Sequence, residues 1–189
     1  MRKKEFPCYE GITAILDCVS RQAVLLQNLA ECGAGYPGWV ATAGQKLRGL
    51  ASAAHREWRE LNEQLGRIFV TPIEREDVSA LAREGMELAE AVAFCGALWR
   101  RYPPEKPAEW TARLAEGARL LRTVAEELPR IRGENAIAPR AGAIYAWRRD
   151  ADRAFEGGDP TPTVCALYDC CRRLARMADT VEWIRLKNG

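Results

Sequence analysis

Apolar residues recur at alternating three- and four-residue steps along most of this 189-residue chain. Such steps match the turn of an α-helix and place the apolar side chains on one face, so each stretch predicts a helix that packs on a common core. The clearest stretches are Ile12, Leu16, Val19, Ala23, Leu26 and Ala30; Val78, Leu81, Gly85, Leu88, Val92, Cys95 and Trp99; and Val164, Leu167, Tyr168, Cys171, Leu174, Ala175, Ala178 and Val181. No stretch shows the strict alternation of a half-buried strand.

Segments rich in proline and glycine divide this pattern into six pieces. The breakers are residues 33–38, 71–72, 102–104 with Pro107, 132–135 and 157–162. We therefore predict helices at about 6–32, 39–69, 73–101, 107–131, 137–156 and 162–187. Because domains commonly contain about 100–200 residues, the chain predicts one all-α domain spanning residues 1–189.

The charge balance bears on which classes of ligand the chain binds. The 28 Lys and Arg residues nearly cancel the 26 Asp and Glu residues, which leaves a formal net charge of +2 at pH 7. This balance argues against nucleic acid as the main ligand. No stretch is long and apolar enough to predict a membrane span, and the N-terminus lacks the apolar region of a signal peptide, so we expect a cytoplasmic protein.

Seven cysteines occur in the chain, and none belongs to a C-x-x-C pair. An odd number of cysteines with several on apolar helix faces predicts reduced, buried thiols. The adjacent residues Cys170 and Cys171 point about 100° apart on a helix, so we expect one in the core and the other near a helix contact.

An internal repeat is indicated by two pairs of short motifs. Trp58-Arg59 stands 13 residues before Thr71-Pro72, and Trp147-Arg148 stands 14 residues before Thr161-Pro162. The two Thr-Pro steps are 90 residues apart, close to half of the chain. We interpret the chain as two halves of three helices each, at about residues 6–101 and 107–187.

The first Thr-Pro step also predicts a helix start. The hydroxyl of Thr71 is suited to the N-cap, Pro72 to the first helical position, and Glu74 to the third position, where it completes a capping box. On this interpretation Thr71→Ala costs about 1 kcal/mol of stability.

Two segments resemble a known family. Residues 67–77 (RIFVTPIERED) are similar to the signature of the PhoU-like proteins associated with Pit-type phosphate permeases, in which the second helix ends in Phe-Ile-Thr-Pro and the third opens with an Asp/Glu-Arg-Glu-Asp step. Residues 181–189 (VEWIRLKNG) resemble the C-terminal run of the same family. The resemblance implies two three-helix bundles packed as a pseudo-symmetric pair.

The resemblance also implies a function. The chain would be a non-enzymatic accessory or regulatory protein of phosphate transport, which binds a Pit-type permease at the inner face of the membrane. Assembly into a homo-oligomer stays open. The alternative is a generic helical scaffold or interaction protein that has lost both the metal sites and the phosphate role.

Carboxylates on the second and third helices of each half hold metal clusters in the family, and the sequence departs from that pattern. The stretches Ala41–Arg56 and Asn135–Arg149 contain no acidic residue. Candidate ligands of a vestigial or single-ion metal site are Glu87, Glu90 and Asp179, although Arg176 opposes a cation near Asp179. The competing interpretation of these acids is solvated charge on helix faces, and we expect no iron or zinc cluster and no other cofactor.

Other chemistry has little support in the sequence. His55 is the only histidine, and no nucleophile is recognisable beside it, so we predict no catalytic residues. The doublets Arg100-Arg101, Arg148-Arg149 and Arg172-Arg173 are either solvated faces or a patch for an acidic partner or membrane headgroups. The core or the helix junctions are the expected positions of Trp58, Trp99, Trp110, Trp147 and Trp183.

Overall fold

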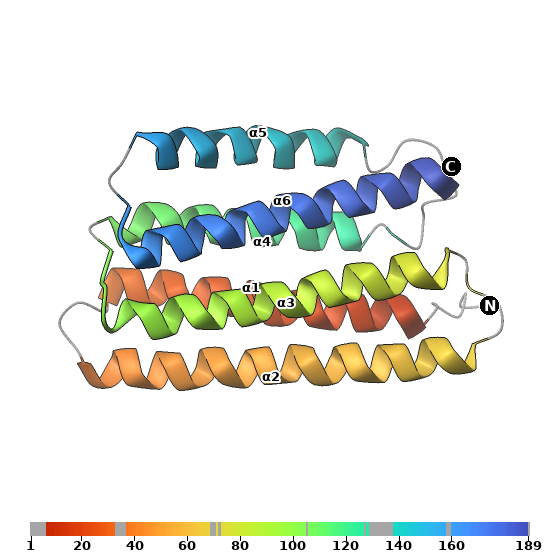
Figure 1. Cartoon of the computed structure of the whole chain (residues 1–189), viewed down its shortest axis with the longest axis horizontal. Coiled ribbons are helices and arrows are strands. Elements are labelled where there is room, and N and C mark those ends of the chain that lie inside the picture. Colours follow the sequence, from red (N-terminus) through yellow and green to blue (C-terminus); the bar gives the residue numbers. More distant parts are fainter. Residues whose placement is uncertain are drawn as a thin grey trace.

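The computed structural model describes residues 7–32, 37–68, 71, 73–104, 106–126, 128, 138–157 and 160–188. These residues form six α-helices and no strand, which confirms the all-α prediction. The helices are α1 (Pro7–Cys32), α2 (Pro37–Arg67), α3 (Arg75–Trp99), α4 (Pro107–Ala125), α5 (Ala138–Glu156) and α6 (Pro162–Asn188) (Figure 1).

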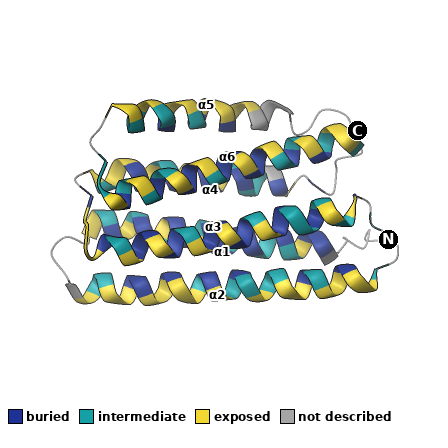
Figure 2. Ribbon diagram, viewed as in Figure 1, coloured by how far each residue is buried: buried dark blue, intermediate teal, exposed yellow. Residues whose placement is uncertain are grey.

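The helices form two sets of three, as the sequence predicts. Helices α1, α2 and α3 contact one another, and so do α4, α5 and α6. The two sets meet where α1 packs on α4 and α3 packs on α6. Four helices therefore lie at the centre of the bundle, and α2 and α5 cover its two opposite sides (Figure 1). Both outer helices turn much of their exposed surface away from the bundle (Figure 2).

A buried glutamine ties the first set together. Gln22 on α1 is fully buried, and its Nε2 donates hydrogen bonds of 2.9 Å to the carbonyl oxygens of Leu47 on α2 and Ala89 on α3. One amide group thus contacts the backbone of both neighbouring helices. These two hydrogen bonds fix the position of α1 along its axis relative to α2 and α3.

In the second set a tryptophan plays the corresponding part. Trp147 on α5 is buried, and its Nε1 donates a hydrogen bond of 2.9 Å to the carbonyl oxygen of Arg113 on α4. Its ring lies directly over Gly117, where a Cβ atom would come within 2.4 Å of Cζ2. The missing side chain of Gly117 therefore allows α5 to pack closely on α4. Near the start of α6, the ring of Tyr168 stacks on that of Phe155, with ring centroids 4.0 Å apart.

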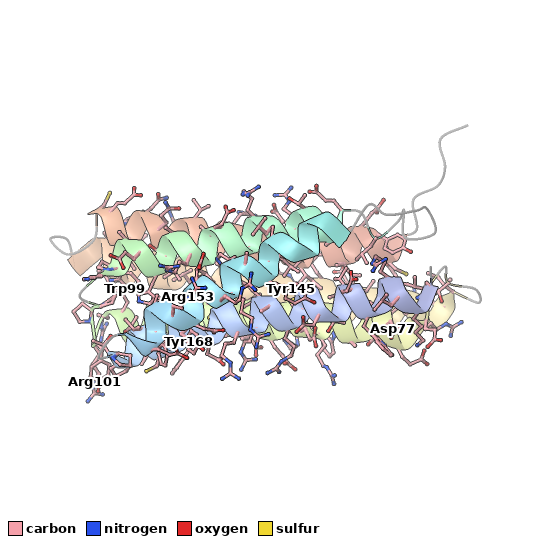
Figure 3. All side chains as sticks on the ribbon, turned by 90° about the horizontal axis from the view of Figure 1, so that it is seen from above. Asp77, Trp99, Arg101, Tyr145, Arg153 and Tyr168 are labelled. Carbon is pink, nitrogen blue, oxygen red and sulfur yellow. The ribbon has the colours of Figure 1, made fainter. Side chains whose placement is uncertain are left out.

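Polar contacts connect the two sets. Arg122 on α4 lies 3.0 Å from Asp17 on α1, and the hydroxyl of Thr180 on α6 donates a hydrogen bond of 3.0 Å to Glu84 on α3. Lys187, near the end of α6, pairs with Glu74 and Asp77 at the start of α3. Figure 3 shows Asp77 at one end of the bundle and Trp99 with Arg101 at the other.

The expected capping box at the start of α3 is wrong. The helix begins at Arg75, and its N-cap is Glu74, which makes no side-chain capping hydrogen bond. Thr71 therefore lies before the cap, and Pro72 is outside the described residues. The Thr cap followed by proline occurs instead at α6, without an acid at the third helical position: Pro162 is the first helical residue, and the Thr161 hydroxyl accepts a hydrogen bond of 3.4 Å from the Val164 N–H.

Other expectations have mixed outcomes. Trp99, Trp110 and Trp147 are buried as predicted, and Trp58 packs against the core, but the side chain of Trp183 is 62% exposed. The described part of α4 ends at Ala125, whereas the sequence predicts an end near residue 131, beyond what is described.

All seven cysteines are free thiols, as expected. Five of them are buried, whereas Cys32 and Cys165 are exposed. Both members of the adjacent pair lie in the core, and the Sγ of Cys170 is 3.6 Å from that of Cys95 on α3. Burial raises the pKa of the Cys171 thiol far above its ordinary value, so the thiolate is disfavoured there.

Among the described residues no helix contains a stretch of sufficient length and apolarity to cross a membrane.

Candidate functional site

The most distinctive polar contact in the first set joins α2 to α3. His55 on α2 places its Nδ1 3.7 Å from the Oε1 of Glu90 on α3. The histidine ring also meets the ring of Trp58 edge-on, with the ring centroids 5.4 Å apart. Both polar side chains remain partly exposed, at 42% for His55 and 57% for Glu90. The pair therefore lies at the surface of the seam between the two helices.

A counterpart occurs in the second set, between α5 and α6. Tyr145 is hydrogen-bonded to Asp179, and Arg148 places its Nη1 3.9 Å from the same carboxylate. Burial is the main cause that raises the pKa of the Tyr145 hydroxyl, and the hydrogen bond to Asp179 adds to it. His55 and Tyr145 are 90 positions apart, and Glu90 and Asp179 are 89 apart. The two seams thus occupy equivalent places in the two halves.

The third candidate ligand faces a different neighbour. The carboxylate of Glu87 lies 4.0 Å from Arg83 on its own helix and 3.8 Å from Arg173 on α6. The three predicted ligands therefore contact three different helices. Glu90 contacts α2, Asp179 contacts α5 and Glu87 contacts α6.

These donor sets do not fit a metal cluster. Within the described ranges no group of three or more His, Cys, Asp or Glu side chains is arranged to hold a metal ion. A hard cation needs several oxygen ligands, but at the α2/α3 seam Glu90 faces a histidine, and at the α5/α6 seam Asp152 and Asp179 both face the guanidinium of Arg148. A cationic guanidinium this close to Asp179 opposes a bound cation.

The structure reveals basic residues around the first seam that the sequence reasoning missed. A groove of about 500 Å³ runs along the α2/α3 seam, and Arg48, Ser52, His55, Arg56 and Arg59 of α2 line it together with Glu90 of α3. Their spacing of four, seven, eight and eleven residues from Arg48 places them on one helix face. Part of the signal was present in the sequence, since residues 41–56 contain no acid but include Lys46, Arg48 and Arg56.

The arginine doublets do not act as one patch. Arg148 pairs with Asp152 and Asp179, and Arg173 pairs with Asp169 and Glu87. The guanidinium of Arg101 lies 5.4 Å from the centroid of the Tyr102 ring, at the end of the bundle marked by Arg101 in Figure 3. Two of the three doublets are thus partly neutralised by acids.

One acid at the contact between the halves is buried enough to raise its pKa. Glu84 on α3 is half-buried against α6, and burial is the main cause that raises its pKa above the ordinary value. The hydrogen bond from Thr180 and the charge of Arg176 oppose this shift. Glu84 is a single acid at a helix contact, and its environment is that of a structural group.

Comparison with known proteins gives a clear result at the level of structure. No protein-family model matches the sequence, and no curated protein matches it. A crystal structure of a PhoU-like protein from Shewanella oneidensis MR-1 is similar to the chain with a TM-score of 0.64 and 18% sequence identity, over 95% of this chain and 97% of that chain. A second, from the same organism and described as a PhoU-like phosphate regulatory protein, has a TM-score of 0.62 and 19% identity over the same shares. The chain therefore has the fold of the PhoU-like proteins.

Proposed function

We propose that this chain is a PhoU-like accessory or regulatory protein of phosphate transport. The observation that carries the proposal is the similarity in fold, which extends over 95% of the chain and includes a solved structure described as a phosphate regulatory protein. The segment 67–77 and the C-terminal run 181–189, which resemble the signatures of the family, support the same function.

The proposed partner is a Pit-type phosphate permease, bound at the cytoplasmic face of the membrane. The two outer helices, α2 and α5, offer long exposed faces on opposite sides of the bundle for such binding (Figure 2). The proposed role requires recognition of another protein and no catalysis.

The test combines binding with transport. The full chain is co-expressed with the Pit-type permease of its own genome, the permease is purified in detergent, and the retained chain is quantified. We expect retention at a fixed ratio to the permease, no retention by an unrelated transporter from the same host, and altered uptake of radiolabelled phosphate in cells that lack the chain. No retention with unchanged uptake would favour the alternative, a helical scaffold without a phosphate role.

The proposal includes the loss of the metal clusters that the family resemblance implies. Because Glu87, Glu90 and Asp179 each face a different helix, at most a weak hard-cation site is expected. Protein purified without added metal should contain well under one iron or zinc per chain, and a chelator should leave its melting temperature unchanged. Stoichiometric metal by elemental analysis, lost on Glu90→Gln or Asp179→Asn, would contradict this.

A further inference from the structure

The groove on the α2/α3 seam has an excess of positive charge. Its lining includes three arginines and a single acid, Glu90, which lies beside His55. None of the three arginines forms an ion pair with any residue in the described parts of the chain. The three arginines are Arg48, Arg56 and Arg59. Their charge is therefore available to a ligand.

The donors in the groove suit an oxyanion. A guanidinium presents a planar fork of N–H groups that matches two oxygens of a phosphate group, and the Ser52 hydroxyl adds a further donor in the same lining. We propose that this groove is a binding site for a phosphate-type oxyanion. The ligand is inorganic phosphate or a small phosphate ester, which takes its charge-assisted hydrogen bonds from Arg56 and Arg59, with Arg48 adding positive charge further along the groove.

The surroundings favour a small anion over a membrane surface. Glu57 stands between Arg56 and Arg59 in the sequence, Glu60 and Glu63 follow on α2, and Glu90 lies within the groove. A lipid surface is attracted by a cluster of cations with few acids beside it. Here the cations line a concave groove with acids on the same helix, which suits a compact ligand that reaches Arg56 and Arg59 together.

The second half of the molecule provides an internal control. The positions 90 residues after Arg48, Arg56 and Arg59 are Ala138, Ala146 and Arg149. The neighbouring Arg148, at the α5/α6 seam, is paired with Asp152 and Asp179. Two of the three arginine positions of the groove are therefore occupied by alanine in the second half. The proposed oxyanion site does not depend on the proposed permease, because it concerns binding by the isolated chain.

The test measures binding of inorganic phosphate to the purified full chain by isothermal titration calorimetry, with ionic strength held constant by chloride. We expect saturable binding that weakens at least about tenfold in the double variant Arg56→Gln/Arg59→Gln, because two charge-assisted hydrogen bonds are lost. Glu90→Gln should strengthen binding, because it removes the only carboxylate of the groove. The matched control, Arg148→Gln/Arg149→Gln on α5, should bind phosphate as the parent chain does.

Three results would overturn the proposal. The first is the absence of phosphate binding, and the second is equal binding by the parent chain and the α2 double variant with an unchanged melting temperature. The third comes from vesicles of phosphatidylcholine with and without phosphatidylglycerol. Sedimentation with the anionic vesicles that requires Arg56 and Arg59, without binding of free phosphate, would assign the groove to lipid headgroups. A permease that binds the α2 double variant normally would leave the proposed function intact.

Discussion

The two three-helix sets share a backbone plan and differ in the polar contacts that hold it. Trp58 and Trp147 occupy equivalent positions on α2 and α5. The indole Nε1 of Trp147 donates a hydrogen bond to the carbonyl oxygen of Arg113. The Nε1 of Trp58 is buried and has no hydrogen-bond partner among the described residues. Both tryptophan rings therefore pack against the core, but their indole N–H groups differ in hydrogen bonding.

The same contrast appears at the helix starts and at the seams. Thr161 caps α6, but Thr71 lies before the N-cap of α3. His55 and Glu90 lie in a groove rich in arginine, whereas Tyr145 and Asp179 belong to a seam whose arginine is paired. Helix packing tolerates such divergence because the apolar stripe, and not the polar surface, determines which face is buried.

The largest expected effect concerns Gln22, the buried residue that links three helices of the first set. Gln22→Ala removes two hydrogen bonds and leaves a cavity, and we expect a loss of about 3 kcal/mol in the free energy of unfolding, measured with urea. Gln22→Met keeps the volume and removes a buried Oε1 that has no partner in the described structure. It should cost about 1 kcal/mol or less.

The second half supplies the matched position for this test. Thr111 lies 89 residues after Gln22 and is also fully buried, but its hydroxyl bonds only to carbonyls of its own helix, at Pro107 and Ala108. Thr111→Val should therefore change stability by less than about 1 kcal/mol. If Gln22→Met proved as harmful as Gln22→Ala, the amide bonds and not the filled volume would hold the first set together.

Two glycines lie where the outer helices α2 and α5 pack on inner helices. An alanine Cβ at Gly117 would meet the indole of Trp147, a rigid ring held by a hydrogen bond, at 2.4 Å. At Gly96 it would meet the terminal Cδ1 of Leu47 at 2.3 Å, which a change of rotamer relieves. We expect Gly117→Ala to cost about 2 kcal/mol by overpacking. Gly96→Ala should be nearly neutral, because a gain of about 1 kcal/mol in helix propensity offsets the strain. Equal costs in thermal unfolding would contradict this.

The third prediction concerns the two Thr-Pro steps. Thr161→Ala should destabilise the protein by about 1 kcal/mol, because the Val164 N–H loses its partner in the first turn of α6. Thr161→Ser should retain most of the stability. Thr71→Ala should have no measurable effect on the melting temperature, in contrast to the sequence-based expectation. A loss on Thr71→Ala would place the N-cap of α3 at Thr71 after all.

The sequence predicts the helices well and the polar chemistry poorly. Apolar periodicity and Pro/Gly breakers place all six helices within a few residues at the ends that the structure describes, because burial of a stripe is a local property of the sequence. The cap at Thr71 fails because the same Thr-Pro step fits a cap in one half and a connecting segment in the other. The groove at Arg48, Arg56 and Arg59 was missed because the pairing of an arginine depends on helices that are distant in sequence.

The smallest expected effect tests the contact between the two halves. Because burial raises the pKa of Glu84, its charged form is less favourable in the folded chain than in the unfolded chain. Its contribution to stability is therefore greatest below the pKa of the unfolded state and is lost as the pH rises through the raised pKa of the folded state. Glu84→Gln keeps an acceptor for the Thr180 hydroxyl and removes the charge, so it should raise the melting temperature slightly at pH 7. The gain should disappear near pH 4, where Glu84 is largely protonated in the folded state.

Glu87→Gln, three residues further along α3, is the control: it removes the contact with Arg173 and should give no gain at pH 7. If Glu84→Gln instead lowers the melting temperature at pH 7, the attraction of Arg176 outweighs burial, and the charge on Glu84 helps to hold α3 and α6 together.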